Sequence, residues 1–266
     1  MFEDKYLGLP VPEGRMKAGK FQSTKDKVLK RLSDWIEKYA SCGVKEDLIK
    51  SVIQALPVYA MGIFKFPASL CKELSQIIRN FWWGDEENRR KTHWLAWDKL
   101  TRPKCEGGMG FRDFEAFNQA LLAKQAWRLL INPESLCARV LRAKYYPDGD
   151  LLKAGPKKGA SFTWQSIVAG IQTFKRGCIW RIGSGSHINI WDDPWIPSSE
   201  SRRIITPKGG TILSKVEELI HPHTGRWDVE LLRDNFLPVD VARILQIPLH
   251  LEVVEDFVAW HFTRSG

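Results

Sequence analysis

The sequence predicts a mainly α-helical protein, in which a helical bundle is followed by a small α+β region with a β-hairpin. Apolar residues recur at helical spacing in about five segments between residues 21 and 146. Gly43, Pro57 and Gly84 separate the first of these segments. After residue 177, short runs rich in β-branched and aromatic residues flank a Gly-Ser-Gly-Ser sequence, which is typical of a hairpin.

The composition is that of a globular protein, because 44% of the 266 residues are hydrophobic and 27% are charged. No apolar run approaches the ~18–20 residues of a membrane-spanning helix, and the acidic, mixed start MFEDKYLGLP is not a signal peptide. The five cysteines lack C-x-x-C spacing, which favours reduced thiols over disulfides or a zinc site. We therefore expect a soluble intracellular protein, and nothing distinguishes the nucleus from the cytoplasm.

The net charge of +9 is unevenly distributed. Residues 1–150 carry 26 Lys and Arg against 19 Asp and Glu, residues 151–200 carry 6 against 3, and residues 201–266 carry 8 against 9. The excess therefore lies in the first three quarters of the chain. It favours a polyanionic partner, and a solvated surface is the alternative explanation.

The first part of the chain contains an expected strand and three expected helices. Lys5–Leu9 is typical of a short strand that ends at Pro10. One helix is expected over about 21–39 and a second over about 45–56, where a proline follows. A third helix is expected to be capped by Ser69 and to end at a glycine.

The second part begins with Gly107, Gly108 and Gly110, which predict a turn with positive φ or close backbone approach. Asp113 is placed to cap a helix over about 114–131, and Pro133 is placed to begin the next helix. Residues 147–160 form an expected linker, and Ser161 is placed to cap a short helix.

The last part contains the expected hairpin, formed by Cys178–Ile182 and His187–Trp191. Short helices are expected near 213–220, 228–236 and 239–246. The final run Phe257–Phe262 alternates like a strand. It has no obvious partner, which indicates that the chain is cut inside a larger unit.

The segment 81–118 combines aromatic and basic residues. Four of the 12 tryptophans lie in its first half: Trp82, Trp83, Trp94 and Trp97. Such rings beside arginine and lysine stack on bases, and the same rings also build cores. Helical spacing favours a core position for Trp35, Trp82 and Trp127. For Trp83, Trp94 and Trp97, both base stacking and core packing stay open.

Other chemically capable residues have simpler structural explanations. Asp192-Asp193 precedes a proline and is expected to form a turn rather than a metal site. His221 and His223 flank a proline and are expected to be loop residues. No histidine or Ser–His–Asp arrangement can be argued around Cys105, and the glycines after it lack the spacing of a P-loop.

A set of motifs occurs in one order along the chain. They are Tyr6-Leu7-Gly8, Trp35, Gly43-x-Lys45-x-x-Leu48-Ile49-Lys50, Pro57-x-Tyr59-x-Met61, Phe81-Trp82-Trp83, Trp94-x-x-Trp97, Pro103-Lys104-x-x-Gly107-Gly108-x-Gly110, Asn118-x-Ala120-Leu121-Leu122, Trp180-Arg181-Ile182-Gly183-x-Gly185 and Ile190-Trp191-x-Asp193-Pro194-Trp195-Ile196. No single motif is specific, but the ordered set resembles the carboxy-terminal part of plant LINE-type (non-LTR) retrotransposon reverse transcriptases.

The resemblance implies a domain organisation. Residues 1–146 would be a thumb-like helical domain, in which residues 5–9 end the palm. Residues 147–160 would be a linker, and residues 161–266 an incomplete α+β connector region. A zinc-binding-like segment and often an RNase H domain follow in the family, and this chain carries neither.

The resemblance also implies an activity for the intact parent, which is an RNA-directed DNA polymerase. Its catalytic aspartates lie in a Tyr-x-Asp-Asp motif that this chain does not contain. Those aspartates hold paired Mg²⁺ ions about 3.5–4 Å apart, so Mg²⁺ is expected only for the intact parent. We expect this chain to be inactive on its own and to use no cofactor.

The basic residues are candidates for contacts with the phosphates of RNA or of an RNA/DNA template–primer duplex, without sequence readout. They are Lys17, Lys20, Lys27, Lys45, Lys50, Arg89, Arg90, Lys91, Arg102 and Lys104. Solvated helix faces are the alternative explanation. The expected function is thus non-specific duplex binding by an inactive reverse-transcriptase fragment. The alternative is a structural or interaction module, or a transposon relic, that binds no nucleic acid. No membrane partner is expected.

Overall fold

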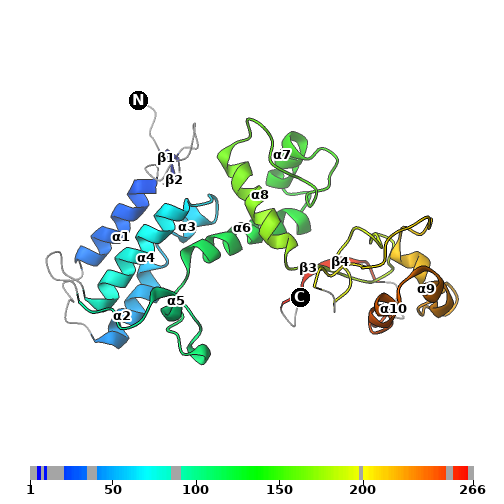
Figure 1. Ribbon diagram of the computed structural model, residues 1–266. Coiled ribbons are helices and arrows are strands. Elements are labelled where there is room, and N and C mark those ends of the chain that lie inside the picture. Colours follow the sequence, from blue (N-terminus) through cyan, green and yellow to red (C-terminus); the bar gives the residue numbers. More distant parts are fainter. Residues whose placement is uncertain are drawn as a thin grey trace. The chain divides into compact units, whose positions relative to one another are not determined.

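A computed structural model describes residues 5–6, 9–10, 21–34, 41–84, 91–197, 200–249 and 254–262. Its contacts divide the chain into two compact units, Met1–Phe174 and Lys175–Gly266. Helices are the main regular elements of the described residues, and the strands form two-stranded antiparallel pairs (Figure 1). The expected mainly α class is therefore confirmed. No described helix has the length and apolarity that a membrane span requires.

The first half of unit 1 is a helical bundle. Its elements are α1 (Gln22–Asp34), α2 (Cys42–Leu48), the π-helix η2 (Ile49–Ile53), α3 (Val58–Met61), α4 (Ala68–Trp83) and α5 (Trp97–Leu100). The helix expected over 45–56 is therefore α2 and η2 in continuous succession. In Figure 1, α1 and α2 lie beside α4. Phe21, Ile49 and Leu74 are fully buried in the core of this bundle.

Helix α4 begins two residues earlier than a Ser69 cap would place it. Pro67 occupies the N-cap position with φ −59° and ψ 141°, so Ser69 lies inside the first turn and does not cap the helix. The prediction of a Ser69 cap was wrong because the fixed φ of proline already suits a helix start. The carboxyl end is as expected, since Gly84 closes the helix with a left-handed φ of 71°.

The turn between α5 and α6 (Phe114–Ile131) contains the 3₁₀ helix η3 (Lys104–Glu106). Gly107 and Gly110 have positive φ values of 79° and 70°. A Cβ atom on Gly108 would lie 2.1 Å from the carbonyl oxygen of Arg102. The expected need for positive φ and close backbone approach is therefore confirmed.

Helix α6 connects the two halves of unit 1. Asp113 caps it as expected, because its Oδ1 accepts the N–H groups of Glu115 and Ala116 at 2.8 and 3.1 Å. One turn later, the buried Asn118 amide donates to the carbonyl oxygens of Met61 and Phe64 and accepts the N–H of Phe66. These bonds hold α6 against the segment that follows α3.

The second half of unit 1 is a smaller lobe made by the end of α6, α7 (Leu136–Tyr145) and α8 (Phe162–Lys175). Helix α7 begins after Ser135, whose Oγ accepts the N–H of Ala138, so Pro133 does not begin it as expected. The serine oxygen accepts one of the N–H groups that have no partner within the helix, so Ser135 is the cap of α7. Leu151 and Ala154, from the expected linker, are buried in the core of this lobe.

Unit 2 contains β3 (Cys178–Arg181), η4 (Val216–Leu219), α9 (Val229–Asn235), α10 (Pro238–Leu245) and β4 (Phe257–Trp260). The short helices expected in the tail are confirmed. A separate apolar core holds the unit together, and Ile188, Trp195, Leu219 and Ile244 are at most 1% exposed in it. The boundary between the two compact units follows Phe174. The assignment of a thumb-like domain, a linker and a connector region stays a prediction.

Three expectations about strands were wrong. Strand β3 pairs with β4, with Cys178 opposite Trp260, and not with residues 187–191. The terminal strand therefore has a partner within the chain. Near the amino terminus, β1 (Lys5–Tyr6) and β2 (Leu9–Pro10) form an antiparallel pair instead of one strand.

Candidate nucleic-acid interface

Glu46 is the centre of a group of lysines in unit 1. Its Oε1 accepts hydrogen bonds from the ammonium groups of Lys50 at 2.6 Å and Lys104 at 2.7 Å. These bonds, the one from Lys104 first, lower the pKa of the Glu46 carboxyl below its ordinary value of 4.5. Lys45 precedes Glu46 in α2, and Lys91 lies close to Lys45. We call these five residues the Glu46 cluster.

Lys45 and Lys91 lie at the carboxyl end of α4. A Cβ atom on Gly84 would be 3.4 Å from the Nζ of Lys45 and 3.2 Å from that of Lys91. Burial lowers the pKa of Lys45, and the positive charge of Lys91 lowers it further. Cations are favourable at this end of a helix, and the Lys45 ammonium also lies 5.6 Å from the centre of the Phe81 ring. The helix end and the ring therefore stabilise a lysine that is only 8% exposed.

Three local features bring the cluster together. Glu46 and Lys50 are four residues apart across the junction of α2 and η2, which is the spacing of a helical ion pair. The tight turn after α5 carries Lys104 to the same carboxylate. The ring of Phe111, which follows that turn, lies 5.9 Å from the Nζ of Lys50.

The aromatic residues of the segment divide into core and surface. Trp82 and Trp97 pack on the Phe111 ring with centroid distances of 5.2 and 5.5 Å, and Trp83 stacks on His93 at 5.7 Å. All three tryptophans are half-buried against the core of the bundle. Trp94 is 79% exposed and is the one exposed tryptophan in the described part of the chain. Among the described tryptophans, its ring is therefore the best placed to stack on a base.

The structure brings together some of the predicted contact residues and not others. Lys45, Lys50, Lys91 and Lys104 belong to the Glu46 cluster, and Arg102 is exposed at the start of the same turn as Lys104. Lys27 is an exposed residue of α1. The remaining four candidates lie outside the described residues: Lys17, Lys20, Arg89 and Arg90.

Sequence reasoning missed Glu46 itself. The signal was present, because a glutamate four residues before a lysine on an expected helix predicts a side-chain ion pair. The contact with Lys104, which is 58 residues away in the sequence, had no such signal. The carboxylate matters because it neutralises part of the charge that a phosphate would meet.

The other chemically capable residues have structural roles. Asp193 closes a turn, since its Oδ2 accepts the N–H of Asn189 at 2.7 Å. The ring of His221 accepts the N–H of His223 within a loop. Among the described residues, no three His, Cys, Asp or Glu side chains come together as a metal site. The described residues therefore do not fit the paired Mg²⁺ ions of a polymerase.

Two proteins of Arabidopsis thaliana are similar to this chain. The "Uncharacterized mitochondrial protein AtMg00310" is 44% identical over 143 residues, which cover 53% of this chain and 93% of that protein. The "Putative ribonuclease H protein At1g65750" is 35% identical over 272 residues, which cover 97% of this chain and 42% of that protein. The chain thus spans less than half the length of the second relative.

No family model matches the chain, and no solved structure matches it. The first relative is covered over almost its whole length at 44% identity. The chain therefore belongs to the family of the Arabidopsis mitochondrial protein AtMg00310.

Proposed function

We propose that this chain derives from a plant LINE-type retrotransposon and corresponds to the thumb and the connector region of its reverse transcriptase. We propose further that it does not polymerise nucleic acid by itself and that it binds an RNA/DNA template–primer duplex without sequence preference. The activity would belong to the intact parent enzyme, because the 266 residues contain no Tyr-x-Asp-Asp motif.

The relatives support the retrotransposon origin. The ordered motifs extend from Tyr6 to Ile196, and the similarity to the putative ribonuclease H protein covers 97% of the chain. In the family that these motifs resemble, an RNase H domain often follows the connector region. A longer relative that is named for ribonuclease H, and of which this chain spans 42%, fits that order.

The Glu46 cluster is the observation that carries the binding proposal. Two of its ammonium groups, from Lys50 and Lys104, share one carboxylate, and those of Lys45 and Lys91 lie together at the end of α4. The side chain of Lys104 is 66% exposed, so a phosphate can reach it without any rearrangement of the core. The exposed Arg102 and Trp94 add a guanidinium group and a free ring in the same segment.

The charge of the whole chain agrees with this location. Residues 1–174 carry 29 Lys and Arg against 19 Asp and Glu, whereas residues 175–266 carry 11 against 12. All of the surplus positive charge thus lies in the unit that contains the Glu46 cluster. Contacts between lysines and phosphates release counterions, so the affinity of such an interface must fall as salt rises.

The proposal is tested by neutralising the two exposed cations of the turn in the double variant Arg102→Gln/Lys104→Gln. Each lost phosphate contact lowers the slope of log affinity against log salt by about 0.7–0.9, so the variant should lose about 1.4–1.8. The measurement is a fluorescence anisotropy titration of an RNA/DNA duplex at several salt concentrations. Lys208→Gln/Arg233→Gln is the matched control, because it removes the same charge from exposed residues of unit 2.

Two results contradict the proposal. A folded chain that does not bind the duplex at about 50 mM salt supports instead a structural module or a relic without nucleic-acid binding. Binding whose salt slope falls equally in both double variants shows that net charge alone, and not this interface, determines the affinity.

A further inference from the structure

The smaller lobe of unit 1 carries a surplus of positive charge, and none of the predicted contact residues lies in it. Residues 119–174 contain 8 Lys and Arg against 3 Asp and Glu. Residues 1–118 contain 21 against 16, so the same surplus is spread over more than twice the length. All eight cations of the lobe are exposed.

Most of these cations have no acidic partner. Lys153 pairs with Asp150 at 3.1 Å. Within the part of the chain that the structure describes, no carboxylate lies at ion-pair distance from the other seven, which are Lys124, Arg128, Arg139, Arg142, Lys144, Lys157 and Lys158. The Glu46 cluster differs in this respect, because its carboxylate already holds two ammonium groups.

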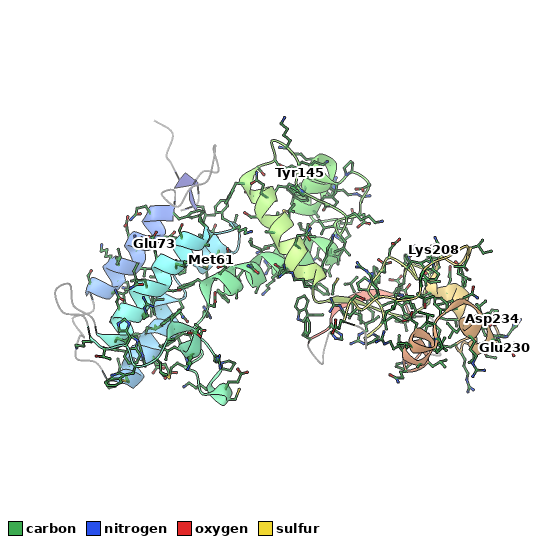
Figure 2. The ribbon with its side chains drawn as sticks, in the orientation of Figure 1. Met61, Glu73, Tyr145, Lys208, Glu230 and Asp234 are labelled. Carbon is green, nitrogen blue, oxygen red and sulfur yellow. The ribbon has the colours of Figure 1, made fainter. Side chains whose placement is uncertain are left out.

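A stack of aromatic rings brings the end of α7 to the segment before α8. The ring of Tyr145, labelled in Figure 2, is parallel to Trp164 at 4.4 Å, and its hydroxyl is hydrogen-bonded to Ser161. The indole N–H of Trp164 donates to the carbonyl oxygen of Gly155 at 3.3 Å. Residues 155–161 are therefore held against Tyr145.

Four of the unpaired cations lie on these joined segments. The ammonium group of Lys144 is 5.4 Å from the centre of the Tyr145 ring, and Lys157 and Lys158 lie within the segment that Trp164 and Ser161 hold. Arg142 lies one turn before Tyr145, with its guanidinium 2.9 Å from where a Cβ atom of Gly149 would be. We call Arg142, Lys144, Lys157 and Lys158 the α7–α8 surface.

The helix end explains only half of this charge. Arg142 and Lys144 lie in the last turn of α7, where the helix dipole favours cations. Lys157 and Lys158 follow no helix end, and their adjacent positive charges repel each other in the absence of an anion. Exposed, unpaired cations in succession are suited to a partner with repeated negative charges, such as a nucleic-acid backbone.

We propose that the α7–α8 surface is a second site for the phosphate backbone, separate from the Glu46 cluster. The site takes a polyanion by charge and does not read bases. The inference rests on the proposed duplex binding and extends it, because it places phosphate contacts in the lobe that follows the bundle.

The test is the triple variant Lys144→Gln/Lys157→Gln/Lys158→Gln of the full chain. Three lost contacts should lower the salt slope for an RNA/DNA duplex by about 2–3. The control is Lys208→Gln/Arg226→Gln/Arg233→Gln, which removes three exposed charges from unit 2 and should leave the slope nearly unchanged. Circular dichroism of both variants verifies that the fold is retained.

Long-chain inorganic polyphosphate serves as a second probe that does not depend on the proposed function. If the protein binds polyphosphate but no duplex, and the first triple variant loses that binding, the α7–α8 surface is a polyanion site and the proposed duplex function is wrong. If the protein binds duplex and the two triple variants lose equal slope, the α7–α8 surface is not a site and the proposed function stands. Unchanged binding of both probes in the first triple variant also overturns the inference.

Discussion

At the scale of single residues, Glu46 determines how much of the lysine charge is available. Its carboxylate holds Lys50 and Lys104 at 2.6 and 2.7 Å, which are distances typical of charge-assisted hydrogen bonds. A backbone phosphate offers the same kind of oxygen acceptor. Duplex binding through these lysines must therefore compete with an acceptor that the protein itself supplies.

We predict that Glu46→Gln strengthens duplex binding. The variant frees two ammonium groups for phosphate, and the salt slope should rise by up to about 1.4–1.8. Glu73→Gln is the control, because it frees one half-buried lysine, Lys25, from an ion pair of similar length on α1 and α4. Anisotropy titrations that show equal gains for the two variants would contradict a specific role for Glu46.

Asn118 shows a limit of prediction from sequence at the level of single residues. The motif that contains Asn118 could be recognised in the sequence, but the hydrogen bonds of its side chain could not be predicted. The amide makes three hydrogen bonds to residues more than 50 positions earlier in the chain. A buried asparagine is tolerated only when such partners exist, and sequence periodicity contains no information about them. Asp113 and the glycines of the turn were predictable because their partners are neighbours in the sequence.

At the scale of elements, Asp256 explains why the expected hairpin does not form. Its buried carboxylate accepts the N–H groups of Gly183 and Gly185 at 2.8 Å and that of His187 at 2.9 Å. The Gly-Ser-Gly-Ser segment therefore binds the Asp256 carboxylate through its backbone N–H groups. It does not form the turn of a β-hairpin. Strand β3 pairs instead with β4, which begins one residue after Asp256.

We predict that Asp256→Asn destabilises unit 2 by about 1.5–3 kcal/mol, the net value of a hydrogen bond to a charged group. The amide keeps one oxygen for the two glycines but directs an N–H₂ group toward the N–H of His187. Urea unfolding followed by tryptophan fluorescence measures the loss. The neighbouring Glu255→Gln is the control, since that side chain belongs to an exposed residue. An equal free energy of unfolding for both variants would contradict the role of Asp256.

Helices and strands could be predicted where the residues that determine them are close together in the sequence. Helices α6, α9 and α10 follow from apolar spacing and from prolines or caps at their ends. The β3–β4 pair joins residues 75 or more positions apart, and the three-donor site of Asp256 joins the same distant segments. Pairing at such separation depends on tertiary contacts, so a Gly-Ser-Gly-Ser sequence between two β-rich runs favoured the wrong partner.

At the scale of the whole molecule, charge and contacts divide the chain at nearly the same place. The contact boundary follows Phe174, and all of the surplus positive charge precedes it. The sequence showed the charge gradient but placed the structural break at 147–160. Leu151 and Ala154 are buried with the second lobe, so that segment is part of unit 1. Both proposed phosphate sites consequently lie in one compact unit.

We predict that residues 1–174 retain the full salt-dependent affinity and that residues 175–266 have none. Affinity by counterion release requires cations in excess, and unit 2 has 11 Lys and Arg against 12 Asp and Glu. Duplex titrations of the two separately expressed units measure this directly, and near-UV circular dichroism establishes that each is folded, since each contains buried tryptophans, Trp164 and Trp195. One phosphate contact corresponds to a salt slope of about 0.7–0.9. If the slope of unit 1 is lower than that of the full chain by more than this amount, unit 2 also contacts phosphate. Such a result would contradict the assignment of both sites to unit 1.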